Sequence, residues 1–323
     1  MSSPRAVVIG QLARDLVLQV DRWPEVGHAA DVGGRREMLG GKGANQAVAL
    51  AQLSVPVALV AVAGDDDIGD NLLTQATRDG VDVTHVVRRP DTPTGLIVEA
   101  LDGAGQWRYL QHLPNEVLLT AADVEASAEL LRAADAVLVQ LQQPPAAALA
   151  ATRLAHEAGR LVVVDGAPAS EGDRPALLAA ADVVRADAHE TRMWTAAPTD
   201  DIDRVLTAAG DILAAGPRLL AFGVDAGNLF TWRDQRWGDG HLLVPLTDQK
   251  VVDTTGAGDA LVAALTAALL RGDPPPTAAR YAVAAAGATV GHPGGRPNLH
   301  QDMLRALLGD GAAEATTSTS SAG

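Results

Sequence analysis

Short apolar runs alternate with longer amphipathic stretches along most of the chain. The runs predict strands, because buried strands of parallel sheets read as continuous apolar segments, at residues 6–10, 57–64, 136–141, 161–165, 182–186 and 218–222. The stretches predict helices at residues 44–53, 71–79, 121–134, 144–159, 202–216, 277–290 and 301–308. Such alternation predicts an α/β fold, with a mostly parallel sheet and helices on both faces.

Further segments predict a separate small sheet. Residues 11–24 alternate apolar with polar positions, and residues 31–39 supply a second strand. Residues 94–100 and 106–111 flank the sequence LDGAG and predict a β-hairpin with a glycine-rich turn. The parts of the chain at about 11–40 and 93–112 therefore form a sheet apart from the main body.

The stretch at 251–272, VVDTTGAGDALVAALTAALLRG, organises the rest of the chain. It begins as a short apolar strand, turns through Gly256, Ala257 and Gly258, and continues from Asp259 as an apolar helix. The first N–H groups of a helix have no internal partner, and glycines let a ligand approach them closely. The helix dipole favours negative charge there, so the stretch predicts an anion site, above all for phosphate.

Asp259 has two interpretations. A carboxylate beside a phosphate pocket repels the ligand, and this cost is explained if Asp259 takes a proton from a hydroxyl that attacks phosphorus. Alternatively, Asp259 is an ordinary capping residue behind a glycine-rich turn. The stretch by itself leaves both interpretations open.

Other polar residues occupy comparable places. Gln142, Asp187 and Gly223 each follow a predicted strand, and ligands of open α/β sheets bind at the carboxyl ends of strands. A second glycine cluster around Lys42 leads into the helix at 44–53, which by pattern alone is a glycine loop with a polar helix start. The acidic triplet at 65–67 suits either a metal ion or the start of the following helix, and the helix start is favoured.

Composition limits the function classes. The net charge is −15 and Lys42 and Lys250 are the only lysines, which excludes the cationic surface that nucleic-acid binding requires. The chain has no cysteine, so disulfides, thiol catalysis and thiolate metal sites are excluded. No P-loop or dinucleotide-binding glycine fingerprint occurs. Without a membrane-length apolar run or a signal peptide at residues 1–10, a cytoplasmic protein is expected, with a disordered tail at 311–323.

DTTGAGDALVAAL and GGKGANQAVA resemble the two signatures of the ribokinase-like (PfkB) family of sugar and nucleoside kinases, the second in its ribokinase form. The resemblance extends from Val7 to about Asn298. It implies a three-layer α/β/α fold in one domain, residues 1–310, with a β lid. It also implies ATP-dependent phosphorylation of a sugar primary hydroxyl, ribose first, with Mg²⁺, an activating K⁺ and a homodimer formed through the lid.

The resemblance also implies roles for individual residues. Asp259 is the expected base, and Gly256, Ala257 and Gly258 form the anion hole. The residues expected around the sugar are Ala13, Asp15, Gly41, Lys42, Gly43, Asn45 and Gln142. Those expected around ATP and Mg²⁺ are Asp187, Glu190, Ala221, Gly223, Val224, Asp225, Ala226, Gly258 and Val283. Those expected around K⁺ are Asp253, Thr255, Thr289, His292, Gly294 and Asn298.

Three positions depart from the ribokinase pattern. Ribokinases carry Asn where this chain has Ala13, Glu where it has Gln142, and Asn where it has Asp187. Glutamine keeps the hydrogen-bonding capacity but loses the charge that strengthens a hydroxyl contact. A kinase for another sugar, a sugar acid or a nucleoside therefore stays open, as does a non-catalytic sugar- or nucleotide-binding regulator. An aromatic content of 3% disfavours a nucleoside, and the retained Asp259 disfavours a regulator.

Overall fold

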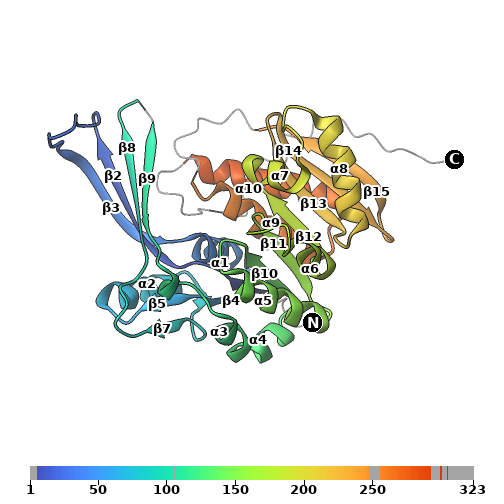
Figure 1. Ribbon diagram of the computed structural model, residues 1–323, viewed down its shortest axis with the longest axis horizontal. Helices are drawn as coiled ribbons and strands as arrows, with labels where there is room; N and C mark the ends of the chain where they lie inside the picture. Colours follow the sequence, from blue (N-terminus) through green and yellow to red (C-terminus); the bar gives the residue numbers. More distant parts are fainter. Residues whose placement is uncertain (1–5, 105, 247–254, 292–298, 300–303, 305–323) are drawn as a thin grey trace.

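The computed structural model describes residues 6–104, 106–246, 255–291, 299 and 304. Its main sheet has nine strands (Figure 1), in the order β15 (Gly238–Val244), β14 (Gly227–Asp234), β13 (Leu219–Val224), β12 (Val183–Ala186), β11 (Leu161–Asp165), β10 (Ala136–Gln140), β1 (Ala6–Ile9), β4 (Val57–Val60) and β6 (Val81–Asp82). The strands from β6 to β13 are parallel, which confirms the expected sheet. β14 and β15 add an antiparallel edge that the sequence analysis did not predict.

Helices cover both faces of this sheet. One face carries α1 (Lys42–Gln52), α2 (Asp67–Arg78), α9 (Ala257–Arg271) and α10 (Pro275–Val290). The other carries α3 (Ala121–Ala126), α4 (Ala128–Ala133), α5 (Pro145–Glu157), α6 (Arg174–Ala180), α7 (Ala188–Thr195) and α8 (Ile202–Ala214). Along β1, Ala6 and Val8 face the first layer while Val7 and Ile9 face the second, because strand side chains alternate. The three-layer α/β/α architecture is confirmed.

A second sheet projects from this body (Figure 1). Its order is β3 (Val32–Gly40), β2 (Ala13–Val20), β8 (Leu96–Asp102) and β9 (Trp107–His112). The central strands β2 and β8 are parallel, and each outer pair is antiparallel. The small sheet predicted from two separate parts of the chain is therefore present. A short 3₁₀ turn, Asn115–Val117, leads back into the body.

Several boundaries differ from the predicted ones. The run at 57–64 is two strands, since β5 (Val62–Gly64) leaves the main sheet to pair with β7 (Val87–Arg89). The helix predicted at 121–134 is divided between α3 and α4 at Ser127. The helix at 301–308 and the strand at 251–252 fall outside the described residues, apart from Leu304. No helix in the described ranges combines the length and apolar character needed to cross a membrane.

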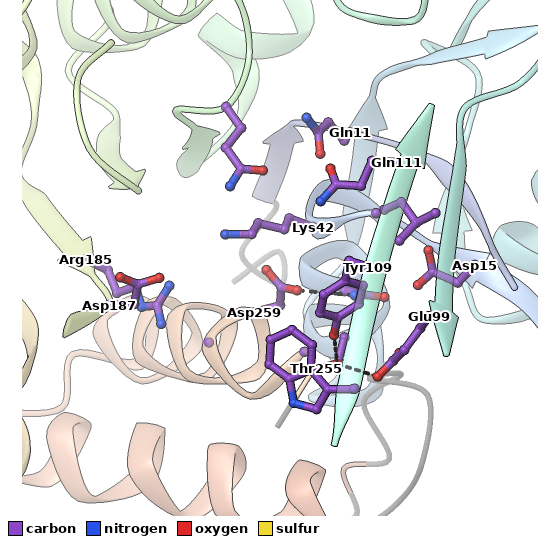
Figure 2. A pocket seen from close by; sticks show the side chains of 17 residues that line it. Gln11, Asp15, Lys42, Glu99, Tyr109, Gln111, Arg185, Asp187, Thr255 and Asp259 are labelled. Carbon is purple, nitrogen blue, oxygen red and sulfur yellow. Dashed lines mark hydrogen bonds between the residues drawn. The ribbon is translucent and has the colours of Figure 1, made fainter. Parts of the chain in front are cut away.

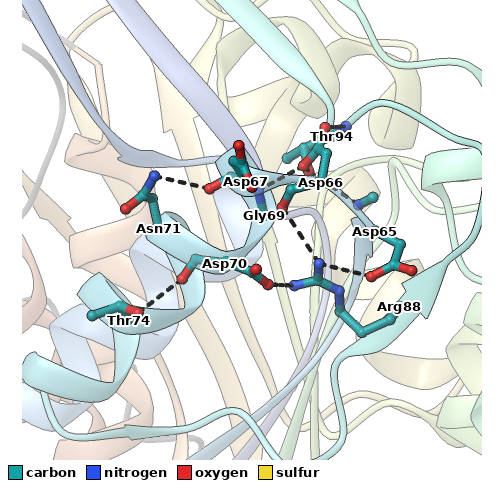
Figure 3. Close-up of polar contacts among 10 residues, drawn as sticks. Asp65, Asp66, Asp67, Gly69, Asp70, Asn71, Thr74, Arg88 and Thr94 are labelled. Atoms are coloured by element: carbon teal, nitrogen blue, oxygen red, sulfur yellow. Dashed lines mark hydrogen bonds and ion pairs between the residues drawn. The ribbon is translucent and has the colours of Figure 1, made fainter.

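The acidic loop before α2 is occupied by hydrogen bonds (Figure 3). Asp66 is the N-cap residue and accepts from Gly69 N at 2.7 Å, Thr94 N at 2.8 Å and Thr94 Oγ1 at 2.6 Å. Arg88 forms ion pairs with Asp65 and Asp70. Burial raises the pKa of Asp66, but the bonds from Thr94 and Gly69 outweigh it and hold that pKa below its usual value. The cap starts α2 earlier than predicted and ties it to the base of β8.

Asp66→Ala is expected to lower the free energy of unfolding by about 2 kcal/mol near neutral pH, since a cap and each further hydrogen bond contribute about 1 kcal/mol. Because the folded-state pKa is lowered, this contribution is present above the ordinary carboxyl pKa and is lost as pH falls through the folded value. Urea unfolding at several pH values measures it. Asp67→Asn, an exposed carboxyl in the same loop, is the control. Equal losses of unfolding free energy in both variants would contradict the assignment of Asp66 as the N-cap residue that stabilises this loop.

Candidate active site

A pocket of about 380 Å³ lies between the small sheet and the carboxyl ends of the main-sheet strands (Figure 2). The chain order reverses around β1, which lies between β4 and β10, and such switch points form crevices in α/β sheets. The pocket is lined by Gln11, Asp15, Gly41, Lys42, Asn45, Ile97, Glu99, Trp107, Tyr109, Gln111, Gln142, Arg185, Asp187, Thr255, Gly256, Gly258 and Asp259.

Asp259 lies in the first turn of α9. Gly256 is the N-cap with φ 72°, a left-handed conformation that glycine adopts without strain. The Asp259 carboxylate is 6% exposed and accepts hydrogen bonds from Asn45 Nδ2 and Gln46 Nε2, each at 3.2 Å. Both donors belong to the start of α1, so the two glycine-led helices meet at this carboxylate.

The network extends to a buried ion pair. Gln46 Nε2 also donates to Asp165 Oδ2 at 2.8 Å, and Asp165 Oδ1 accepts from Arg185 Nη1 at 2.9 Å. Burial raises the pKa of Asp259 to about 6. The Lys42 charge and the hydrogen bonds from Gln46 and Asn45 oppose this rise, and the Asp165 charge adds to it. Asp259 is therefore a stronger base than an ordinary carboxylate and is still ionised at neutral pH.

The start of α1 is fixed by close backbone packing. Gly41 has φ 87° and precedes the helix. Gly43 packs against Gly10, the residue that follows β1. A Cβ added to Gly43 would lie 2.6 Å from the Gly10 carbonyl carbon. This packing leaves Lys42 and Asn45 in the pocket, with Lys42 Nζ 3.9 Å from Glu190 Oε1.

The start of α7 presents two carboxylates. Asp187 Oδ1 accepts from Glu190 N, and Glu190 Oε2 accepts from Asp187 N, each at 2.8 Å, which forms a capping box. Burial raises the pKa of Glu190 above its ordinary value. One oxygen of each carboxylate lies outside the capping box, and such hard oxygens suit Mg²⁺.

The small sheet supplies the opposite wall. Asp15 on β2 is 8% exposed and packs against Gly40, where any Cβ would collide with its carboxyl group. Thr255 Oγ1 donates to Glu99 Oε1 at 3.3 Å and is hydrogen-bonded to the Tyr109 hydroxyl. These contacts join the small sheet, which was expected to be a lid, to the start of α9.

Sequence reasoning missed several lining residues. The missed lid residues alternate along the predicted hairpin and were detectable from that period of two: Ile97, Glu99, Trp107, Tyr109 and Gln111. Gln11 follows the first strand directly, so strand-end position was its signal. Asp165 and Arg185 carried no signal of their own, because their roles depend on the pairing of β11 with β12.

Most residues expected around the sugar come together, but two do not. Ala13 is fully buried in β2 and Gly43 faces Gly10, so neither lines the pocket. Of the residues expected around K⁺, Thr255 contacts the lid, and Thr289 Oγ1 donates within α10 to Ala285 O. The other four lie outside the described residues: Asp253, His292, Gly294 and Asn298.

A second pocket, of about 220 Å³, adjoins the first. Its lining is mostly apolar and includes Val283, which was expected near the nucleotide, and Ala257, which was expected in the anion hole. It shares Arg185 and Gly258 with the first pocket.

The segment from Ala221 to Ala226, also expected near the nucleotide, lines neither pocket. Ala221 and Val224 are buried within β13, and Gly223 packs on the backbone of Ala188. Asp225 accepts a hydrogen bond from Thr199. The reason is that β13 extends past the predicted end of the strand at residue 222 to Val224 and pairs with β14. Asn228 on β14 lines the second pocket instead.

Residues 3–302 match the sequence profile of the pfkB family carbohydrate kinase. The chain belongs to the PfkB family of carbohydrate kinases. It is 29% identical over 304 residues to a ribokinase of Schizosaccharomyces pombe, covering 91% of this chain and 94% of that one. It is 31% identical over 307 residues to an ATP-dependent ribose-1-phosphate kinase of Halopiger xanaduensis, covering 95% and 98%. The ribokinase structure from Thermotoga maritima superposes with a TM-score of 0.76, at 26% identity, over 95% of this chain and 99% of that one.

These matches identify this PfkB family member as an ATP-dependent sugar kinase. The finer assignment, to one sugar and one set of catalytic residues, rests on the pocket itself.

In this PfkB kinase, Asp259→Asn is expected to stabilise the fold at alkaline pH. The folded-state pKa of Asp259 is raised, so between about pH 4 and 6 the folded chain binds more protons than the unfolded chain. The free energy of unfolding therefore falls as pH rises through that window. The variant should exceed the parent by about 1–3 kcal/mol above the window and by little below it.

Urea unfolding at pH 4.5 and pH 8 measures this difference, with Asp211→Asn, an exposed carboxyl on α8, as the control. If the variant were no more stable than the parent at pH 8, burial of the ionised Asp259 carboxylate would not be destabilising the fold.

Proposed function

We propose that this PfkB kinase transfers the γ-phosphoryl group of ATP to the primary hydroxyl of a free pentose, with D-ribose as the substrate and ribose 5-phosphate as the product. The observation that carries the proposal is the Asp259 carboxylate, buried in a polar pocket beside the glycine-led start of α9. The relatives named ribokinase support the choice of sugar.

Asp259 accepts the hydroxyl proton as the sugar oxygen attacks the γ-phosphorus. The bond from that phosphorus to the bridging oxygen breaks, and its electron pair leaves on ADP. A pKa of about 6 suits a general base near neutral pH. The N–H groups of the Gly256–Gly258 turn, at the positive end of α9, stabilise the charge of the phosphoryl group. The lid excludes water, which would otherwise accept the phosphoryl group.

Asp187 and Glu190 have the ligand chemistry for Mg²⁺, through the carboxylate oxygens outside the capping box. Within the described residues no group of three acidic, histidine or cysteine side chains is arranged to hold a metal ion, so phosphate and water must supply the remaining ligands. When bound, the ion would neutralise phosphate charge. The K⁺ site stays a prediction, as does the homodimer, which the exposed Val32 and Leu110 on the lid would favour.

The pocket suits an uncharged polyol. Among its lining residues only Lys42 and Arg185 are basic, while the lid side presents Asp15 and Glu99. In ribose 1-phosphate the phosphate lies at the other end of the sugar from the reacting hydroxyl, toward these carboxylates. This repulsion favours a free sugar over the substrate named for the Halopiger relative.

A nucleoside is the second candidate. Trp107 and Tyr109 both line the pocket, with ring centroids 4.5 Å apart, although the whole chain has only nine aromatic residues. Low aromatic content therefore does not argue against a nucleoside, since the rings are concentrated where a base or a sugar face would stack.

Asp259→Asn is expected to lower kcat by about 10²–10⁴-fold, the usual contribution of a general base. Affinity for ATP should stay within about threefold, because the change only removes a charge that repels phosphate. Steady-state kinetics and nucleotide titration measure the two effects, with Asp211→Asn as the unaffected control. Near-normal turnover in Asp259→Asn would show that another group removes the proton.

Release of ADP should be fastest with ribose in a panel that also contains other pentoses, hexoses, sugar acids, ribose 1-phosphate and nucleosides. Gln142→Glu is then expected to lower KM for ribose by about 3–10-fold, since a charged acceptor strengthens a hydroxyl contact. Glutamate also keeps the bond that Gln142 Oε1 accepts from Gln140. If only nucleosides, or only ribose 1-phosphate, were phosphorylated, that compound and not ribose would be the substrate.

A further inference from the structure

Arg185 lies where the two pockets meet. Together with Gly258 it is common to both linings, so it borders the path between the second pocket and Asp259. The guanidinium packs directly on the glycine turn, since a Cβ on Gly258 would collide with Nη2 of Arg185. In Figure 2, Arg185 lies on one side of Asp259, and the lid carboxylates Asp15 and Glu99 lie on the other.

Only part of this guanidinium is used within the protein. In the described part of the chain its one hydrogen bond runs from Nη1 to Asp165 Oδ1. Burial works against the charged form, but the carboxylates of Asp165, Glu190 and Asp259 outweigh it and raise the pKa of Arg185, so the charge is permanent. Among the described residues nothing accepts a hydrogen bond from its Nε or Nη2, which are available to a ligand at the junction.

We propose that Arg185 is a catalytic residue that contacts the γ-phosphoryl group of ATP during its transfer. The inference rests on the proposed function, since the phosphoryl group must pass from the nucleotide pocket to a hydroxyl held at Asp259. As the phosphorus–oxygen bond to ADP breaks and the bond to the sugar oxygen forms, the proton goes to Asp259. Arg185 neutralises the charge on the transferring oxygens, a role that planar guanidinium groups fill in other phosphoryl-transfer sites.

Asp165 is then a positioning residue. It holds Nη1 from the neighbouring strand, with Asp165 and Arg185 paired in the β11–β12 register. Through Gln46 it also joins the guanidinium to Asp259, so the cation and the base are oriented by one network. A purely structural role explains this arrangement poorly, because buried ion pairs contribute little net stability compared with apolar residues of similar size.

The test compares Mg²⁺-bound ADP with Mg²⁺-bound AMPPNP, a non-hydrolysable ATP analogue, by calorimetric titration without sugar. In Arg185→Gln, affinity for AMPPNP should fall by about tenfold or more while affinity for ADP stays within about threefold, because only the analogue has a γ-phosphoryl group. With sugar and ATP, kcat should fall by about 10²–10³-fold with little change in the sugar KM. Arg233→Gln, an exposed arginine of β14, is the control and should change neither.

Two further variants separate catalysis from structure. Asp165→Asn keeps the guanidinium and should lose less AMPPNP affinity than Arg185→Gln, whereas equal losses would mean that Arg185 serves only the ion pair. Turnover of Arg185→Ala should be partly restored by added guanidinium ions but not by methylammonium. Unchanged AMPPNP affinity in Arg185→Gln, with ADP still bound, would overturn the proposal.

The same experiment separates the proposed substrate from the proposed contact of Arg185 with the γ-phosphoryl group. If the parent protein phosphorylates no sugar but Arg185→Gln still loses only AMPPNP affinity, the proposed substrate is wrong and the contact of Arg185 with the γ-phosphoryl group stands. If the parent binds neither nucleotide, both fail.

Discussion

Burial of the Asp259 carboxylate is the constraint around which this molecule is built. An ionised group that is 6% exposed is tolerated only where donors surround it, and Asn45 and Gln46 supply them from the start of α1. That requirement brings two glycine-led helices together at the carboxyl edge of the sheet. The glycines of both turns allow close packing there, since Gly41 and Gly43 let backbone approach backbone and Gly258 lets the Arg185 guanidinium approach the start of α9.

The charges around this carboxylate divide the site into two halves. Toward the lid, Asp15 and Glu99 suit hydroxyl groups; toward α7 and α9, Arg185 and the helix start suit phosphate. Asp259 lies between them, at the place where the proposed mechanism requires a proton acceptor. The acidic net charge of the whole chain therefore does not prevent phosphate binding. The electrostatic potential inside the pocket is set locally by the dipoles of the helix start and by one guanidinium group.

The sequence predicted the layers, the small sheet and the helix start that carries Asp259, because each depends on a local period or on glycines at a turn. It did not predict the antiparallel edge, because the strand was expected to end at residue 222 and no strand was expected at β14 or β15. It also failed for Ala13, since family position alone does not say that a side chain is fully buried. Arg185 and Asp165 lie 20 residues apart and become partners only through the pairing of two strands, which no local pattern reports.

The construction of the lid has a consequence for the lifetime of a bound sugar. Its two halves come from distant parts of the chain, but the parallel pairing of β2 with β8 joins them into one hydrogen-bonded sheet. Under the proposed function, in which this sheet opens as a lid, Asp15, Glu99 and Tyr109 would move as a unit, and their contacts with a sugar would form and break in a single step. The residence time of the sugar would then follow the opening rate of the sheet, which includes release of Thr255 from Glu99 and Tyr109, and no single sugar contact would set it.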